Sequence, residues 1–282
     1  MSSNEYILKF VCPDQLGIVR AVSDWLFQRK CNIIDSDQFG DPYTGNFFMR
    51  VHFGGEVDEQ SLHNEFGEVA EPRQLDWEFW PMARRPRALI MVSKLDHCLA
   101  DLLYRLRNNE LGVDVSLIVS NHRDAYPMAA ANDIDFLHLP VTPATKVEQE
   151  SRLAAEISSR NIDFVVLARY MQILSDEFCA EFPGRIINIH HSFLPSFKGA
   201  KPYHQAHEKG VKLIGATAHY VTPELDEGPI IEQGIERVDH RSTPEQLVAI
   251  GRDIERVVLA KAVRYHAEQR ILLNGHRTVV FD

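Results

Sequence analysis

The chain has 282 residues, enough for one large domain or two ordinary domains with substantial apolar cores. Its formal net charge of −10 argues against a protein that neutralises nucleic-acid phosphates, and its 45% hydrophobic content is typical of a globular protein. No segment approaches the roughly 18 consecutive apolar residues of a membrane helix and no signal-peptide pattern opens the chain, so we expect a cytoplasmic protein that binds neither nucleic acid nor membrane.

The first eighty residues alternate the patterns of strands and helices. Phe47, Met49, Val51 and Phe53 alternate with mostly polar residues, which is the period-two pattern of a strand with one covered face. We predict strands over residues 5–12, 32–39, 47–53 and 75–79, and helices over residues 16–29 and 58–70. The order βαββαβ is that of a ferredoxin-like antiparallel sheet with two helices on one face.

This order, together with residues 14–19 (DQLGIV) at the first strand-to-helix turn, resembles the ACT-domain family. The resemblance implies a small effector, often an amino acid, and association into a homo-oligomer. The implied effector-binding residues are Asp14, Leu16, Gly17 and Ile18. Asp14 precedes a helix N-terminus, whose free N–H groups favour anionic ligand atoms, and Gly17 permits close approach of the backbone. Alternatively, Asp14 only caps the helix, in a domain that serves oligomerisation alone.

Residues 81–86 contain two prolines and no periodicity, so they are predicted to link two domains, residues 1–80 and residues 87–282. Residues 88–92 form a continuous apolar run typical of a buried parallel strand. Further strands are predicted over residues 113–119, 135–139, 164–168, 185–189, 212–221 and 229–235, and helices over residues 95–106, 144–159, 174–182, 202–209 and 244–269. This alternation predicts an α/β fold with a doubly wound, mostly parallel sheet, which binds ligands beyond the carboxyl ends of its strands.

Asn188 and His190 end one of the predicted strands. Side chains two residues apart on a strand point the same way, so the amide and the imidazole can converge on one atom. Asp226 lies in a later loop, just before Gly228 and Pro229, and can reach the same edge of the sheet. An amide that donates to an oxyanion, an imidazole acid and a carboxylate that holds the imidazole suit chemistry at a carbonyl carbon. Each residue alone is more often a turn or capping residue, so the prediction depends on the combination.

Residues 188–195 (NIHHSFLP), 226–231 (DEGPII) and 169–175 (RYMQILS) resemble the folate-dependent formyltransferase family, and the similarity extends over residues 87–236. The resemblance implies a formyltransferase-like sheet domain in which Asn188, His190 and Asp226 are catalytic. It also implies that the folate pterin binds between residues 169–175 and the loop of residues 222–226. The implied substrate-binding residues are Tyr170, Met171, Ile173, Leu174, Thr222, Glu224 and Leu225.

Departures from the transferase pattern point to a relative of that family. The turn after the first strand of this domain, residues 92–97 (VSKLDH), has no glycine, whereas a phosphate cradle needs exposed backbone N–H groups and little side chain. His191, residues 198–203 (KGAKPY) and the ACT-like N-terminus resemble the formyltetrahydrofolate deformylase family, along essentially the whole chain. This resemblance implies hydrolysis of 10-formyltetrahydrofolate to formate and tetrahydrofolate, without a cofactor.

Two other functions remain open from the residues alone. One is formyl transfer to a small amine, because the missing glycine cradle argues only against a phosphorylated acceptor. The other is a non-catalytic sensor of folate or amino acids, although a pure binder has no need of an amide, an imidazole and a carboxylate together.

Several histidines, one lysine and the cysteines have no assigned role in this reaction. His191 is expected to orient His190 or the attacking water or, as the slightly favoured alternative, to pack beneath the loop. Lys201 is expected either to meet the glutamate tail of the folate or to be solvated. No metal site is expected from the spacing of the other candidate ligands, which are interpreted as structural residues and free thiols. These residues are His138, His204, His207, His219, Cys12, Cys31, Cys98 and Cys179.

Overall fold

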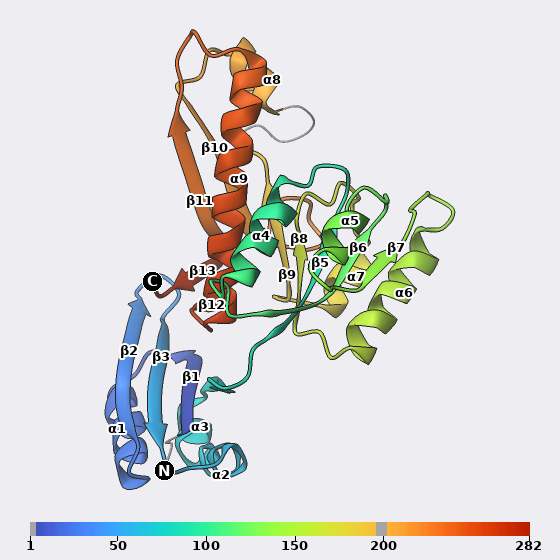
Figure 1. Ribbon diagram of the computed structural model, residues 1–282. Coiled ribbons are helices and arrows are strands. Elements are labelled where there is room, and N and C mark those ends of the chain that lie inside the picture. The colour runs from blue at the N-terminus through green and yellow to red at the C-terminus, as the bar shows by residue number, and fades with distance from the viewer. Residues whose placement is uncertain (1–3, 196–201) are drawn as a thin grey trace. The chain divides into compact units, whose positions relative to one another are not determined.

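The computed structural model describes residues 4–195 and 202–282, and the chain divides into two compact units. Unit 1 consists of Met1–Arg85 and Gln269–Asp282, and unit 2 consists of Pro86–Glu268 (Figure 1). From the sequence, residues 269–282 are expected in the second domain. They belong to unit 1 instead, because they form a hairpin that packs on the first sheet.

Unit 1 is built on a four-stranded antiparallel sheet in the order β2-β3-β1-β4 (Figure 1). Its elements are β1 (Asn4–Pro13), α1 (Ile18–Gln28), β2 (Asn32–Asp41), β3 (Asn46–Gly55), α2 (Glu59–Glu65), α3 (Gly67–Ala70), the 3-10 turn η1 (Glu71–Arg73), β4 (Asp76–Pro81), β12 (Ile271–Asn274) and β13 (Arg277–Val280). The predicted order βαββαβ is confirmed, with the second helix split in two at Phe66. The rings of Trp25 and Phe66, 4.9 Å apart between centroids, help to fill the core between helices and sheet.

The hairpin of β12 and β13 covers part of the other face of this sheet. Leu272 and Phe281 pack with Phe48 in a small second core. Phe48 alternates along β3 with the residues of the first core, so its side chain lies on the opposite face. At the end of β2, the buried carboxylate of Asp41 accepts a hydrogen bond of 2.8 Å from Asn274 Nδ2. Apolar burial and this polar contact explain why the last residues fold with the first.

Unit 2 is built on a seven-stranded sheet in the order β11-β10-β9-β8-β5-β6-β7 (Figure 1). Strands β5 to β9 are parallel, whereas β10 and β11 run antiparallel to their neighbours, so the predicted mostly parallel sheet is confirmed. The strands are β5 (Arg87–Val92), β6 (Asp114–Ser120), β7 (Phe136–His138), β8 (Phe164–Leu167), β9 (Ile186–His190), β10 (Leu213–Tyr220) and β11 (Ile230–Arg237). Because β5 lies between β6 and β8, the strand order reverses there, and ligands are expected at the adjoining carboxyl ends.

The helices of unit 2 follow the predicted alternation with the strands. They are α4 (His97–Arg107), α5 (Tyr126–Ala130), α6 (Lys146–Ser159), α7 (Asp176–Glu181), α8 (Pro202–Glu208) and α9 (Pro244–Ala267), of which only the short α5 was not predicted. The long helix α9 begins at a capping box, in which Thr243 and Gln246 each bond the other's backbone N–H. Within the described ranges, no helix is long and apolar enough to cross a lipid bilayer.

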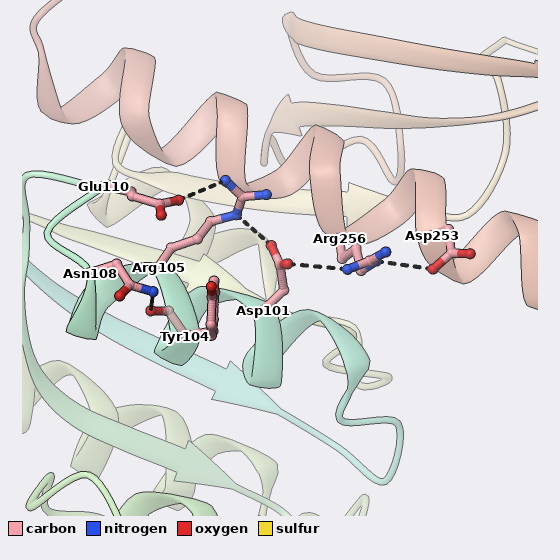
Figure 2. A network of polar contacts seen from close by, with 7 residues as sticks. All are labelled: Asp101, Tyr104, Arg105, Asn108, Glu110, Asp253 and Arg256. Carbon is pink, nitrogen blue, oxygen red and sulfur yellow. Dashed lines mark hydrogen bonds and ion pairs between the residues drawn. The ribbon is translucent and has the colours of Figure 1, made fainter.

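Helices α4 and α9 are joined by a network of ion pairs (Figure 2). Asp101 Oδ2 lies 2.7 Å from Arg105 Nε on the same helix, and Asp101 Oδ1 lies 3.5 Å from Arg256 Nη1 on α9. The Asp101 side chain is only 8% exposed, so salt screens these pairs less than pairs on the surface. The network holds α9 against α4 and thereby positions Glu255, the residue before Arg256.

Candidate active site

A cavity of about 620 Å³ lies in unit 2 at the carboxyl ends of the parallel strands. Its wall is formed by residues that follow β5 and β8, by the end of β9, by the end of β10 with the loop after it, and by α9. This is the edge where the reversal of strand order predicts a ligand. Asn188, His190 and Asp226 all line this one cavity, so the structure brings together the three residues that the sequence singled out.

His190 and Asp226 form the central pair of the cavity. His190 Nδ1 lies 3.2 Å from Asp226 Oδ2, and His190 is only 5% exposed. An ionised carboxylate can only accept, so Nδ1 carries the hydrogen and Nε2 is the free ring nitrogen. His190 Nε2 is buried and has no hydrogen-bond partner among the described residues. A buried polar atom left open in this way marks a place for a ligand atom.

Asn188 and His219 lie directly opposite each other on the antiparallel strands β9 and β10. His219 Nδ1 lies 2.8 Å from the backbone oxygen of Tyr220, so in the neutral ring Nδ1 donates and Nε2 accepts. Asn188 Nδ2 lies 3.2 Å from His219 Nε2 and donates one of its two hydrogens there. The second amide hydrogen remains for a ligand. His219 was interpreted as structural from its spacing, because only the strand register reveals its position against Asn188.

The backbone and the surroundings of Asp226 are both unusual. Its φ of 57° lies in the left-handed region, which is uncommon for a residue other than glycine. Its second oxygen, Oδ1, lies 3.7 Å from His219 Nε2, beyond hydrogen-bond distance. Burial raises the pKa of Asp226, but the contacts with His190 and His219 outweigh burial and hold the pKa well below its usual range. Asp226 is therefore an anion that fixes His190.

Apolar side chains line the cavity beside this polar group. Met171, Ile173 and Leu225 are 54%, 63% and 59% exposed, and large apolar side chains gathered around a cavity mark a binding site for an apolar ligand surface. The predicted substrate-binding residues that line the cavity are Tyr170, Met171, Ile173, Leu174, Thr222 and Leu225. Glu224 is not among the lining residues. It is exposed, and its backbone oxygen accepts a hydrogen bond of 3.2 Å from Thr222 Oγ1, so it helps to fix the loop.

His191 also lines the cavity, with its ring centroid 5.0 Å from that of His190. Burial, followed by the nearby charge of Arg169, lowers the pKa of His191 to about 4, so the ring is neutral near pH 7. The favoured expectation of a buried packing role is met only in part, because His191 is half-buried and reaches the cavity. Lys201, the other residue with an open role, lies outside the described residues.

The predicted effector residues lie before and at the start of α1. Gly17, with φ of 87°, is the residue at which the helix begins, and no side chain caps it. The alternative reading of Asp14 as a helix cap is therefore wrong. Ile18 is buried in the core, so only its backbone could meet a ligand, whereas Leu16 is fully exposed. The left-handed φ is the physical reason for glycine at position 17.

A second polar group lines the same cavity and was not singled out by the sequence analysis. Glu255 Oε2 lies 2.8 Å from His97 Nε2 and 3.3 Å from Arg169 Nε, and Tyr203 donates to Glu255 Oε1 at 2.8 Å. Burial raises the pKa of Glu255, but His97 and Arg169 lower it more, so Glu255 is ionised. A glutamate among the apolar residues of α9 is the signal that could have found it.

His97, Cys98 and Glu255 place one possible metal-binding atom each within 4.8 Å of one another. Two observations make this donor set unsuitable for a cation. The guanidinium of Arg169 already neutralises Glu255 and would repel a metal ion. Burial raises the pKa of the Cys98 thiol far above its ordinary value, which disfavours the thiolate that a metal needs. The group fits an ion-pair cluster instead.

Similarity to known proteins identifies the family to which this chain belongs. Residues 86–263 match the family described as Formyl transferase. The chain is 47% identical to the formyltetrahydrofolate deformylase of Corynebacterium sp. (strain P-1), over 98% of this chain and 97% of that protein. This chain belongs to the formyltetrahydrofolate deformylase family. The crystal structure of the deformylase from Burkholderia mallei ATCC 23344, at 50% identity, has a TM-score of 0.95 and covers 99% of this chain and 100% of that one.

The two units of this deformylase-family chain differ in how widely they are shared. Glycinamide ribonucleotide transformylase 1 from Symbiobacterium toebii is 32% identical, with a TM-score of 0.67 over 72% of this chain and 97% of that one. The Formyl transferase match lies within unit 2, whereas the deformylase matches extend over both units. The sheet with the cavity is thus common to hydrolases and transferases of the formyl group, and unit 1 is shared with the deformylases.

Proposed function

We propose that this chain hydrolyses 10-formyltetrahydrofolate to formate and tetrahydrofolate. The observation that carries the proposal is the cavity in which Asp226 holds His190 Nδ1 while His190 Nε2 is buried and open to a ligand. The names of the related deformylases support the reaction, and the cavity supports where it takes place. The reaction is redox-neutral and consumes only water, so its balance requires no cofactor.

The folate pterin is proposed to bind against the apolar part of the cavity. Met171 and Ile173 lie on one segment of the wall and Leu225 on another, and all three are exposed when no ligand covers them. Covering such side chains with the face of a flat ring removes apolar surface from water, at about 25 cal/mol for each Å². Binding there brings the formyl group of the substrate toward Asn188, His190 and Asp226.

Attack on the formyl carbon is proposed to use His190 as the proton carrier. A water oxygen forms a bond to the formyl carbon while His190 Nε2 takes a proton from that water. Asp226, held as an anion, fixes the ring through Nδ1 and stabilises the imidazolium that forms. General acid–base catalysis of this kind typically contributes about 10² to 10⁴ in rate.

Asn188 is proposed to stabilise the oxyanion of the tetrahedral intermediate. One amide hydrogen is bound to His219 Nε2, which leaves the second to donate to the developing oxyanion. Removal of one such donor typically costs about 2.7 to 4 kcal/mol. The intermediate then collapses: the bond from carbon to N10 breaks, its electron pair stays on N10, and His190 Nε2 returns its proton there. The other proton of the water leaves with formic acid, which ionises in solution, so formate and tetrahydrofolate are the products.

The proposal is tested by mixing the protein with 10-formyltetrahydrofolate and no acceptor, and measuring formate and tetrahydrofolate. We expect equal amounts of the two products. If no product forms until a small amine is added, the protein is a formyltransferase instead. If no product forms under either condition, the protein is a sensor. A repeat with His190→Ala protein shows whether the products depend on the cavity.

Unit 1 is proposed to bind an amino acid near residues 14–18 and to join chains into a homo-oligomer. The edge strand β2 supports pairing of chains, because Ile34 and Phe39 on it are 50% and 43% exposed. All four cysteines are free thiols, which supports a reduced compartment such as the cytoplasm. A monomer in light scattering, together with a hydrolysis rate indifferent to every amino acid tested, would contradict the proposal for unit 1.

A further inference from the structure

The cluster of His97, Arg169, Tyr203 and Glu255 occupies part of the cavity wall but has no task in the mechanism above. Both oxygens of Glu255 are engaged, since Oε1 accepts from Tyr203 and Oε2 lies against His97 and Arg169. Glu255 and Asp226 are the carboxylates on the described part of the wall. One of these two acids is therefore engaged with the catalytic histidine, and the other is saturated by its own neighbours.

Three features show that this cluster is costly to build. The side chains of Arg169 and Glu255 are 8% and 2% exposed, and a buried ion pair is seldom more stable than apolar residues of the same size. Arg169 has φ of 63°, in the left-handed region that strains a residue other than glycine. Gly251, inside α9, lacks the Cβ that would overlap the ring of Tyr203, and glycine weakens a helix. Such a combination at a cavity indicates a role in function.

The ring of His191 lies near both the catalytic His190 and Tyr203 of the cluster. The centroid of His191 lies 5.0 Å from that of His190 and 6.4 Å from that of Tyr203. Arg169 immediately precedes the segment of Tyr170 and Met171 that lines the proposed pterin site. Arg169 Nε is buried and, within the described residues, makes no hydrogen bond, because its contact with Glu255 lacks the geometry of one. Arg169 thus lines the cavity beside its ion-pair partner Glu255, with a buried polar atom that no described residue satisfies.

These contacts decide which nucleophile can approach. An amine acceptor is largely protonated at neutral pH, and because Asp226 is already committed to His190, a second carboxylate with an unengaged oxygen would have to hold the amine and accept its proton. Glu255 has no free oxygen, and Arg169 repels a cation, whereas neutral water meets neither obstacle. We infer that the cluster excludes amines from the formyl carbon and so makes this site a hydrolase rather than a transferase. The inference rests on the proposed deformylase function.

The test replaces Arg169 by glycine, which removes the guanidinium and suits the left-handed backbone. Wild-type and Arg169→Gly proteins are each incubated with 10-formyltetrahydrofolate and increasing glycinamide, and formate and N-formylglycinamide are measured by mass spectrometry. We expect the wild type to release formate at every amine concentration. Arg169→Gly is expected to form N-formylglycinamide at least about tenfold faster than wild type, a ratio typical for loss of one discriminating contact.

Two further variants keep the test decisive. Arg169→Gly/Glu255→Gln removes both charges together and leaves no unpaired ion, so it protects against misfolding of the single variant, and the same gain of transfer is expected. Arg252→Gln is the matched control: it removes an exposed cation from the same cavity wall and is expected to form no N-formylglycinamide. A merely structural role for Arg169 would slow both products and would not change their ratio.

Contrary outcomes are readily distinguished. If folded Arg169→Gly or double-variant protein releases formate but makes no more N-formylglycinamide than wild type, the cluster does not select the nucleophile. Wild-type protein that forms N-formylglycinamide as fast as it releases formate overturns the inference without need of a variant. If the wild type releases no formate even without the amine, it is the proposed hydrolysis that fails.

Discussion

The two carboxylates of the cavity, Asp226 and Glu255, have similar partners but differ in how many hydrogen-bonding atoms remain open. Each lies beside a histidine, and each has its pKa held below the usual range by its neighbours. Asp226 binds one nitrogen of His190 and leaves the other open to the cavity. Glu255 is saturated by Tyr203, His97 and Arg169. A carboxylate whose histidine partner keeps a free ring nitrogen can take part in the reaction. A carboxylate with both oxygens engaged instead fixes the shape of the cavity in which the reaction occurs.

The largest effect should follow from breaking the open pair. We expect His190→Ala to lower the rate of formate release by about 10² to 10⁴, because the proton carrier is lost. Binding of tetrahydrofolate, measured by calorimetry, should persist, since the apolar wall is untouched. Asp226→Asn should show a similar loss with an intact fold, because asparagine tolerates the left-handed φ of 57°. Near-normal turnover in either variant would refute the assignment of the pair.

Removing the charge of Glu255, the saturated carboxylate, should mainly lower the free energy of unfolding. Glu255→Gln leaves Arg169 buried without its counter-charge, and removing one partner of a buried pair typically costs about 3 to 5 kcal/mol. We expect the urea midpoint of unit 2, followed by far-ultraviolet circular dichroism, to fall accordingly. Glu232→Gln is the control: it breaks the more exposed pair with Lys261, 2.6 Å apart, and should cost less than about 1 kcal/mol. An equal loss of stability in Glu255→Gln and Glu232→Gln would contradict the claim that the buried pair matters more than the exposed one.

Much of the fold was predictable, because the strands carry their own periodicity. The apolar run of β5 and the alternation along β3 identify buried and half-covered strands without tertiary information. The hairpin of β12 and β13 was missed, since strands of four residues are too short to show a period. The Asn274–Gly275 pair directly after the apolar residues of β12 was the available signal for that turn, in which Gly275 has φ of 62°. Its docking on residues more than 200 positions away has no local signature.

The site was predictable only where its residues share a strand or a loop. Asn188 and His190 lie two apart on β9, so their convergence follows from strand geometry. His219 reaches Asn188 through the antiparallel register of β10, which spacing alone does not fix. Glu255 and Arg169 meet through the rotation of a helix and the position of a strand end, far apart in sequence. Contacts set by register and packing must come from the structure.

The contact of Tyr203 with α9 offers a smaller test of the saturated cluster. Alanine in place of a helical glycine usually stabilises by about 1 kcal/mol, but a Cβ on Gly251 would overlap the Tyr203 ring and displace it from Glu255. We therefore expect Gly251→Ala to destabilise unit 2 by about 1 to 3 kcal/mol, as overpacking does. In a Tyr203→Ala background the same change should stabilise instead, and a cycle of the four proteins measures the coupling. Independent effects would show that the two residues do not interact.

The smallest expected effect concerns His191, whose ring lies near those of His190 and Tyr203, the partners of the two carboxylates. Its folded pKa of about 4 is below the ordinary value of 6.5, so between these values the unfolded chain binds a proton that the folded chain does not. The contribution to stability is therefore complete above pH 6.5 and is lost as the pH falls toward 4. We expect the urea midpoint of His191→Asn to fall less steeply over this window than that of wild type. Parallel slopes would mean that a different group, such as Glu255 at the acid end, controls the response.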